Sequence, residues 1–143
     1  MWESQTAGLE KAKGTSVIIF DSDKRVLLYL RDDKPTIPFP DRWDLIGGEV
    51  ETEETPDMCI ARELREELGY DRKEPQLFEI YKFDDRIEYT YCIADTIDVS
   101  TTRLYEGQYL RWFSRDEVMQ MSDEMFAFGF KRVLEDFYRL QGY

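Results

Sequence analysis

The segment GEVETEETPDMCIARELREELGY, which spans residues 48–70, decides the fold of this chain. Thr55 is a residue type that caps helix N-termini, and Pro56 suits the first helical position because its missing N–H has no helical partner there. Gly69 is a typical helix end, because glycine adopts the left-handed conformation that closes many helices. The segment therefore predicts an acidic loop over residues 49–54, followed by a helix that stops at Gly69.

Three glutamates share one face of this predicted helix. Glu63, Glu66 and Glu67 stand at positions i, i+3 and i+4, whereas Leu64 and Leu68 lie on a different face that can pack on a sheet. Like charges at this spacing cost about 0.2–0.5 kcal/mol per pair even on an exposed helix. A bound Mg²⁺ ion would turn the repulsion into attraction, because hard divalent cations prefer carboxylate oxygens. Taken alone, the glutamates favour a simpler interpretation, a solvated acidic face.

Length and composition indicate one domain. The chain has 143 residues, of which 42% are hydrophobic, and this is enough for one core. Without repeats or a linker-like segment, residues 1–143 are interpreted as a single domain. The sequence contains no stretch of eighteen apolar residues, so no membrane-spanning helix is expected. Met1–Gly14 does not resemble a secretory signal. Cys59 and Cys92 form no disulfide framework and predict a reducing cytoplasmic location.

The absence of histidine narrows the chemistry. It excludes Ser-His-Asp and Cys-His nucleophile arrangements and every metal site of Cys/His type. A metal ion must therefore have oxygen ligands, which favours Mg²⁺, Mn²⁺ or Ca²⁺. The formal net charge is −12, so the chain should repel a nucleic-acid duplex and an anionic membrane unless a local basic patch intervenes. Simple solubility is the alternative interpretation of this charge.

The rest of the sequence predicts strands on both sides of the helix. Alternating β-branched and aromatic residues, with turns at residues 21–23 and 84–85, are typical of strands. The predicted strands cover residues 15–20, 26–31, 43–46, 76–83, 87–95 and 109–114. Helical spacing of apolar residues predicts a helix over residues 126–140, and residues 116–121 are a candidate short helix. This order predicts a mixed sheet with helices on both faces.

The glutamates belong to a longer pattern of fixed positions. Gly48, Glu54, Arg62, Gly69 and Tyr70 stand at set offsets from them. Together these residues satisfy every defined position of the Nudix box, with the tyrosine as its final bulky apolar residue. The chain therefore resembles the Nudix hydrolases, and it is most similar to their nucleotide-cleansing, MutT-like branch. The resemblance implies an α/β fold, the Nudix-type α/β/α sandwich with a mixed β-sheet and a catalytic loop–helix–loop.

The resemblance also implies a divalent metal site. In the family the box holds one or more divalent cations, so we expect Mg²⁺ as the cofactor, with Mn²⁺ as a substitute. By this resemblance Glu66 and Glu67 are metal ligands. Glu63 is expected to be a further ligand or a base, and the backbone carbonyl of Gly47 is expected to be another ligand.

Two further box residues and one distant acid complete the expected site. The resemblance implies that Arg62 orients the cluster through an ion pair with Glu54, since a guanidinium fork fixes carboxylates without losing its proton. It also implies a fourth carboxylate from a later loop, and we assign this role to Glu106. An ordinary turn acid is the alternative for that residue. Its rivals as the fourth ligand are Asp84, Asp85 and Glu88.

The implied reaction is hydrolysis of a diphosphate linkage. Water attacks phosphorus, while metal ions lower the pKa of that water and neutralise the phosphoryl oxygens. Without histidine, a carboxylate must take the proton, and Glu63, Glu66 and Glu106 are the candidates. A nucleoside triphosphate, cut to the monophosphate and pyrophosphate, is the first expected small-molecule substrate. ADP-ribose, a sugar nucleotide and a dinucleoside polyphosphate are the alternatives.

Substrate contacts are expected outside the box. Arg31 and Arg86 are candidates to contact a phosphate or a base, and each has the alternative of being a surface charge. Trp43 is a candidate to contact the substrate, with core packing as the competing interpretation. Three aromatic residues are candidates for one wall of a base pocket or for the core, namely Phe126, Phe128 and Phe130.

Two positions depart from common family features, and two other protein classes compete. Ile46 stands where many members have proline, and Glu53 stands where many have glycine. A non-catalytic Nudix domain that binds a nucleotide, and an unrelated metal-buffering acidic domain, are the competing classes. A homodimer is a further expectation, provided that aromatic residues such as Tyr138 or Tyr143 are exposed.

Overall fold

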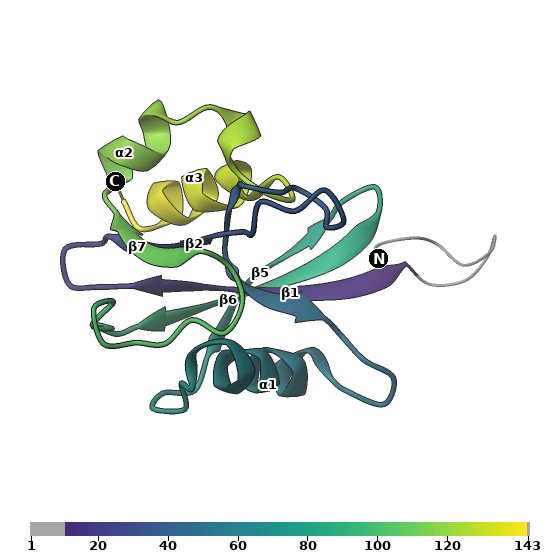
Figure 1. Ribbon diagram of the computed structural model, residues 1–143. Helices are drawn as coiled ribbons and strands as arrows, with labels where there is room; N and C mark the ends of the chain where they lie inside the picture. Colours follow the sequence, from purple (N-terminus) through teal and green to yellow (C-terminus); the bar gives the residue numbers. More distant parts are fainter. Residues whose placement is uncertain (1–10, 143) are drawn as a thin grey trace. The chain divides into compact units, whose positions relative to one another are not determined.

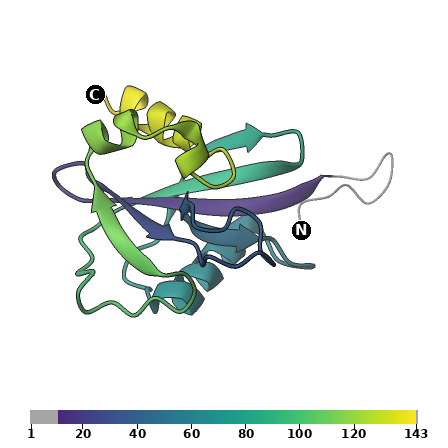
Figure 2. The ribbon, with the colours of Figure 1, turned by 45° about the horizontal axis from the view of Figure 1, so that its top comes forward.

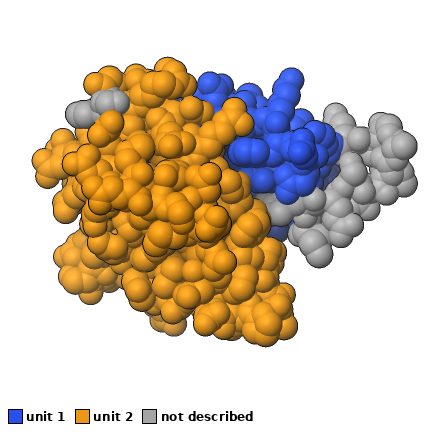
Figure 3. All heavy atoms as spheres, turned by 90° about the horizontal axis from the view of Figure 1, so that it is seen from above, with its two compact units in different colours: residues 1–18, 46–93 blue, residues 19–45, 94–143 orange. Residues whose placement is uncertain are grey.

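The structure, a computed structural model, describes residues 11–142. Its residues divide into two compact units, one of residues 1–18 and 46–93 and one of residues 19–45 and 94–143 (Figure 3). The prediction on a secretory signal concerns Met1–Gly14 and falls largely outside the described residues. No helix among residues 11–142 is long and apolar enough to span a membrane. The single domain and the cytoplasmic location stay predictions.

The first unit combines strands with the helix of the box (Figure 1). Its elements are β1 (Ala12–Phe20, which ends in the second unit), β4 (Ile46–Glu49), α1 (Pro56–Leu68), β5 (Gln76–Lys82) and β6 (Arg86–Ala94). Strand β1 pairs with β4 in antiparallel fashion, and β6 is hydrogen-bonded to both β1 and β5. Helix α1 lies along the strands, where the Tyr91 hydroxyl of β6 donates to Asp57 Oδ1 at 2.5 Å. This contact ties the first turn of α1 to the sheet.

The second unit holds the remaining strands and helices (Figure 2). Its elements are β2 (Val26–Leu30), β3 (Trp43–Asp44), β7 (Tyr109–Phe113), α2 (Arg115–Gln120), a 3₁₀ helix η1 (Asp123–Met125) and α3 (Phe130–Leu140). Strands β1 and β2 pair in antiparallel fashion, with Phe20 opposite Val26, and β2 also pairs with β3 and β7. Helices α2 and α3 lie side by side. Apolar spacing on α3 buries Val133, Leu134 and Phe137, as its sequence predicts.

The predicted α/β fold with a mixed sheet is confirmed. Strand β1 begins at Ala12, earlier than the predicted residue 15, and two other elements differ more strongly from their predicted bounds. The strand expected over residues 43–46 is two strands, because the chain changes its pairing partner at Leu45. Strand β3 pairs with β2, whereas β4 pairs with β1. The helix expected from Phe126 begins at Phe130, because Phe126 bridges to Trp43 and Gly129 adopts a left-handed φ of 74°.

Tyr138 does not offer the exposed aromatic surface that the homodimer expectation requires. Its side chain is 1% exposed, and its hydroxyl donates to the Lys24 carbonyl at 2.8 Å. Tyr143, the other residue named for this role, lies outside the described residues. The homodimer itself stays a prediction.

Candidate active site

Local sequence signals build the loop–helix–loop as predicted. The side chain of Thr55 accepts a hydrogen bond at 3.1 Å from a backbone N–H of the first turn, and Pro56 starts that turn. Gly69 closes α1 in the left-handed conformation, with φ 63°, and its N–H donates to carbonyls of the last turn. Leu64 and Leu68 are buried, so the apolar face is anchored and the glutamate face is left for polar contacts.

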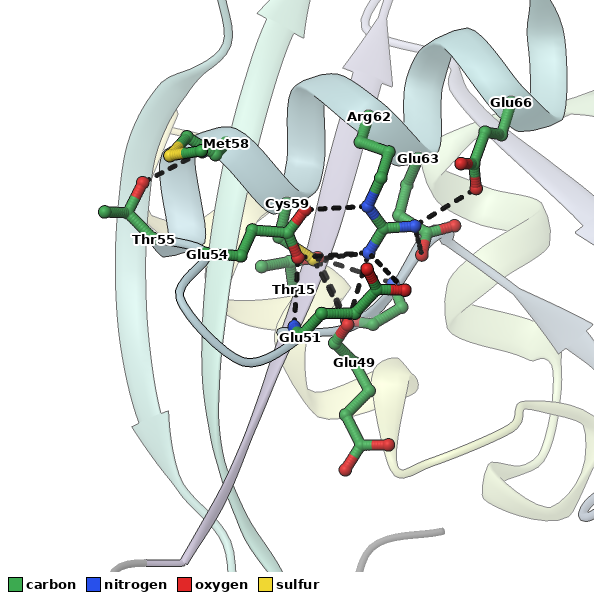
Figure 4. A network of polar contacts seen from close by, with 11 residues as sticks. Thr15, Glu49, Glu51, Glu54, Thr55, Met58, Cys59, Arg62, Glu63 and Glu66 are labelled. Atoms are coloured by element: carbon green, nitrogen blue, oxygen red, sulfur yellow. Dashed lines mark hydrogen bonds and ion pairs between the residues drawn. The ribbon is translucent and has the colours of Figure 1, made fainter.

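Arg62 gathers the box carboxylates around one guanidinium (Figure 4). Its Nε and Nη2 atoms donate to the two carboxylate oxygens of Glu54 at 2.7 and 3.1 Å. Its Nη1 atom donates to Glu63 Oε2 at 3.2 Å and to Glu66 Oε1 at 3.1 Å. The expected ion pair with Glu54 is therefore present and bidentate, and the same guanidinium also contacts two expected metal ligands.

The carboxylates of this cluster differ in their exposure to water. Hydrogen bonds from Arg62 lower the pKa of Glu54 to about 2, and the same bonds raise the pKa of Arg62. The Glu54 and Glu63 side chains are 10% and 12% exposed, whereas that of Glu66 is 58% exposed. The cluster thus combines a fixed inner part with a carboxylate that is open to water.

The double glycine of β4 allows a close approach of backbone and carboxylate. Gly47 and Gly48 pair with Ser16 and Thr15 of β1. A Cβ atom at Gly47 would lie 2.0 Å from the Thr15 carbonyl oxygen, and one at Gly48 would lie 2.2 Å from Glu63 Oε2. A side chain at either position would displace β1 or the Glu63 carboxylate, so both glycines are steric requirements here.

Cys59, one turn before Glu63, is buried within this polar network. Its Sγ atom lies 3.2 Å from Thr15 Oγ1 and 3.7 Å from the Gly48 carbonyl oxygen. Burial raises the pKa of the thiol to about 12, so the thiol keeps its proton and is a poor nucleophile.

The donor set fits a hard divalent cation. Carboxylate and backbone carbonyl oxygens are the ligands that Mg²⁺ prefers, and the space left by the missing Cβ of Gly48 admits the Glu63 carboxylate. Glu67 follows Glu66 on the same helical face, and its Oε2 atom is buried. Among residues 11–142 no group of three or more Cys, Asp or Glu side chains is arranged to hold a metal ion. A cation bound by Glu63 and Glu66 would compete with Arg62 for their oxygens.

In the second unit, Arg31 is held from several sides. Its Nη1 atom pairs with Asp44 Oδ2 at 2.9 Å, and its Nε atom donates to the Pro38 carbonyl at 3.0 Å. Its guanidinium carbon lies 5.1 Å from the centre of the Phe128 ring. Burial raises the pKa of Asp44, although the neighbouring Arg31 opposes the rise. Sequence reasoning missed Asp44, yet an acid within the apolar run of β3 is a recognisable sign of a buried polar partner.

Glu106 and Arg31 line one cavity of the second unit, with a volume of about 390 Å³. The other lining residues are Tyr29, Asp32, Lys34, Ile37, Tyr105 and Gly107. The lining thus combines two cationic side chains, Arg31 and Lys34, with two acidic ones, Asp32 and Glu106. The role of Glu106 as a fourth metal ligand stays a prediction, because it belongs to the second unit and the box to the first.

The aromatic candidates lie in packed surroundings. The ring centroids of Trp43 and Phe113 are 4.6 Å apart in an edge-on arrangement. Phe126 and Phe130 are each 3% exposed, which confirms the core interpretation for both. Phe128 packs on Arg31 instead. A substrate contact at Trp43 stays a prediction.

Arg86 lies at the start of β6 in the first unit, and its side chain is 3% exposed. Its Nε atom donates to Glu88 Oε1 at 2.7 Å, and its guanidinium carbon lies 4.3 Å from the centre of the Phe83 ring. Glu88, a rival for the fourth ligand, is therefore part of a buried ion pair. The surface-charge alternative for Arg86 is wrong, and its substrate contact stays a prediction.

The two departures from common family features have different structural settings. Ile46 is 3% exposed and lies opposite Val17 in the pairing of β4 with β1. Glu53 has φ 67°, a left-handed conformation that glycine adopts without strain. The side chain at residue 53 is therefore accommodated at a conformational cost within the acidic loop.

Carboxylates organised by one arginine on a loop–helix–loop, carried by an α/β fold, define a recognisable class of hydrolase. The NUDIX domain model matches residues 10–137, and the chain belongs to the NUDIX domain family. This match and its MutT-like relatives indicate a pyrophosphohydrolase.

Individual relatives agree with this assignment. A MutT-like protein of Streptomyces ambofaciens is 30% identical over 112 residues, which are 77% of this chain and 68% of that protein. Diphosphoinositol polyphosphate phosphohydrolase 2 of Rattus norvegicus is 32% identical over 91 residues, which are 58% of this chain but only 49% of the rat protein. The chain thus matches about half the length of that relative. The crystal structure of a MutT protein from Methanosarcina mazei Go1 covers 92% of this chain and 96% of its own, with a TM-score of 0.69 at 22% identity, which shows a shared fold.

Proposed function

We propose that this chain is a Mg²⁺-dependent pyrophosphohydrolase that cuts a nucleoside triphosphate into the monophosphate and pyrophosphate. The observation that carries the proposal is the Arg62 cluster, in which one guanidinium contacts Glu54, Glu63 and Glu66. Anhydride hydrolysis needs several carboxylates held together despite their repulsion, with part of the cluster open to water. The partly exposed cluster meets both needs, and the resemblance of the chain to the nucleotide-cleansing, MutT-like branch supports the substrate class.

The chain's own residues account for the steps of this reaction. Bound Mg²⁺ would stabilise charge on the phosphoryl oxygens and lower the pKa of the attacking water. The residues proposed to hold it are Gly47, Glu63, Glu66, Glu67 and Glu106. Arg62 positions its carboxylates and keeps its own charge throughout, because a guanidinium does not lose its proton near neutral pH. A carboxylate takes the proton of the water, with Glu63, Glu66 and Glu106 as candidates.

Substrate binding is proposed for the cavity of the second unit. Arg31 and Lys34 give it two positive side chains, and Tyr29 and Tyr105 give it aromatic surface. Such a lining supports a ligand with phosphates and a ring, as a nucleotide has. Arg86 and Trp43 are further proposed contacts.

A second candidate substrate is a polyphosphorylated molecule without a base. The rat relative is named for diphosphoinositol polyphosphates, and Arg31 and Lys34 are the cationic residues of the cavity that could contact such phosphates. ADP-ribose, sugar nucleotides and dinucleoside polyphosphates are further alternatives, as is a domain that binds a nucleotide without cutting it.

A substrate panel tests the proposal. The full chain is incubated with normal and oxidised nucleoside triphosphates, ADP-ribose, sugar nucleotides, dinucleoside polyphosphates and a diphosphoinositol polyphosphate. Each incubation is run with Mg²⁺ and with Mn²⁺, and products are identified by chromatography. Glu67→Gln removes the charge of one proposed ligand. Glu135→Gln makes the same change at an exposed position of α3 and is the matched control.

The outcomes separate the candidates. We expect turnover of triphosphates by the wild-type chain and by Glu135→Gln, with loss of turnover in Glu67→Gln and on chelation. Turnover of the diphosphoinositol compound alone would replace the nucleotide proposal with the second candidate. If no compound is cut but one raises the melting temperature, the catalytic proposal is withdrawn in favour of a binding domain.

A further inference from the structure

The hydroxyl of Thr15 contacts both peptide groups that flank Gly48 in β4. Thr15 Oγ1 donates to the Gly48 carbonyl oxygen at 3.0 Å, and it accepts from the Gly48 N–H at 3.4 Å. Thr15 lies opposite Gly48 in the pairing of β1 with β4 and is 4% exposed. One buried side chain on a neighbouring strand thus contacts two successive peptide planes of the double glycine.

These contacts affect the direction of the Gly47 carbonyl. The Gly48 N–H belongs to the same planar, trans peptide group as the Gly47 carbonyl, so the N–H and the C=O point in opposite directions. When Thr15 holds the N–H, the orientation of the carbonyl oxygen is fixed as well. Two successive glycines have no Cβ atom to restrict their dihedral angles, so an external contact has more effect here than elsewhere in a strand.

The same hydroxyl is itself supported by α1. Cys59 Sγ lies 3.2 Å from Thr15 Oγ1 and 3.5 Å from the Glu49 carbonyl oxygen. When Thr15 Oγ1 donates its proton to the Gly48 carbonyl, its lone pairs remain available to accept from the thiol, which also has the Glu49 carbonyl as an acceptor. The hydroxyl of Thr15 thus connects α1 to β4 through Cys59 and Gly48 (Figure 4).

We propose that Thr15 is a positioning residue for the metal, and that its hydroxyl aims the Gly47 carbonyl through the Gly47–Gly48 peptide plane. This inference rests on the proposed function, in which that carbonyl is a ligand. Groups that orient metal ligands typically contribute roughly 10- to 100-fold to metal affinity. Since one ligand of several is affected, removal of the hydroxyl weakens metal binding by about tenfold.

A matched residue in the same sheet separates positioning from simple stability. Thr90 of β6 is fully buried, and its hydroxyl forms a 2.9 Å hydrogen bond with Ser16 Oγ. Thr90→Val therefore removes a buried hydroxyl from the same unit by the same substitution as Thr15→Val. Thr15→Ser keeps the hydroxyl and loses only a methyl group.

The test measures binding of Mn²⁺ alone to the full chain by electron paramagnetic resonance of the free ion, with melting temperatures for every variant. We expect Thr15→Val to raise the half-saturating Mn²⁺ concentration by about tenfold. We expect Thr15→Ser and Thr90→Val to bind as the wild-type chain does. If the valine variant does not fold, Thr15→Ala removes the same hydroxyl in a smaller side chain. The Mg²⁺ concentration for half-maximal hydrolysis is expected to shift in parallel.

Three results would overturn the inference, and they distinguish its failure from failure of the proposed function. If the wild-type chain binds Mn²⁺ and Thr15→Val binds it equally well, the positioning role fails while the proposed function stands. The same holds if Thr90→Val weakens binding as much as Thr15→Val, because a general loss of stability then explains both. If the wild-type chain binds no Mn²⁺, the metal site and the positioning role fail together.

Discussion

Arg62 and Arg86 belong to the same unit, and each donates to carboxylates, but their surroundings differ. Arg62 forms ion pairs with four glutamates, and their side chains range from 10% to 67% exposed. Arg86 and Glu88 are 3% and 2% exposed. The first network can exchange a partner for a metal ion or water, because part of it is solvated. In the second network the Arg86–Glu88 pair is buried, so loss of either partner would leave a buried charge, although Arg86 also pairs with the half-exposed Asp85 at 3.2 Å. An arginine–carboxylate contact thus has different consequences according to its exposure.

The largest expected effect comes from breaking the buried pair. Arg86→Ala leaves the Glu88 carboxylate buried without its guanidinium, and we expect the free energy of unfolding to fall by about 3–5 kcal/mol. Urea unfolding measures this change. The double variant Arg86→Met/Glu88→Leu removes both charges and is expected to recover most of the loss. A single variant as stable as the wild-type chain would contradict the buried-pair interpretation.

Disruption of the partly exposed Arg62 network is expected to lower activity more than stability. Arg62→Lys keeps the charge but cannot form the bidentate contact with Glu54, so the carboxylates lose their fixed positions. We expect kcat/KM to fall by about 100-fold, with a change of less than about 1 kcal/mol in unfolding free energy. Arg65→Lys makes the same change at an exposed position of α1 and is the matched control. Full activity in Arg62→Lys would show that a positive charge at residue 62 is enough to position the carboxylates, without the bidentate contact.

The pH dependence of stability sharpens the same contrast. Arg62 lowers the pKa of Glu54 to about 2 from an ordinary 4.5, so ionised Glu54 stabilises the folded chain above pH 4.5. This contribution is lost as the pH falls from 4.5 towards 2. We expect Glu54→Gln to cost roughly 1–2 kcal/mol at pH 7, with the gap to the wild-type chain narrowing below pH 4.5. Urea unfolding at several pH values measures it, and a gap that widens in acid would refute the assignment.

The smallest expected effect concerns the acidic loop that leads to the Arg62 network. Glu53→Gly relieves the left-handed backbone at residue 53, although glycine also adds freedom to the unfolded chain. We expect a net gain of about 0.5 kcal/mol in unfolding free energy, measured by urea unfolding, with activity retained. Val50→Gly is a control without a left-handed φ and should destabilise. Loss of activity in Glu53→Gly would instead show that this carboxylate is used.

Much of the candidate site follows from the sequence, because its signals act over short separations. Thr55, Pro56 and Gly69 bound α1 through contacts within a turn of the helix, and the i, i+3, i+4 spacing places the glutamates on one face. Glu54 is also near Arg62 along the chain, so the family pattern was sufficient to predict their ion pair.

Other features were decided only by tertiary structure. The division of residues 43–49 into two strands, and the start of α3 at Phe130, depend on pairing with partners that are distant in the sequence. The contact of Thr15 with Gly48 joins residues 33 positions apart, and the burial of Arg86 depends on what packs around β6. Helical spacing and capping are local, whereas strand pairing and burial arise only when distant segments meet. The sequence by itself therefore determined the box helix and its carboxylates, and the tertiary structure decided which side chains hold them in place.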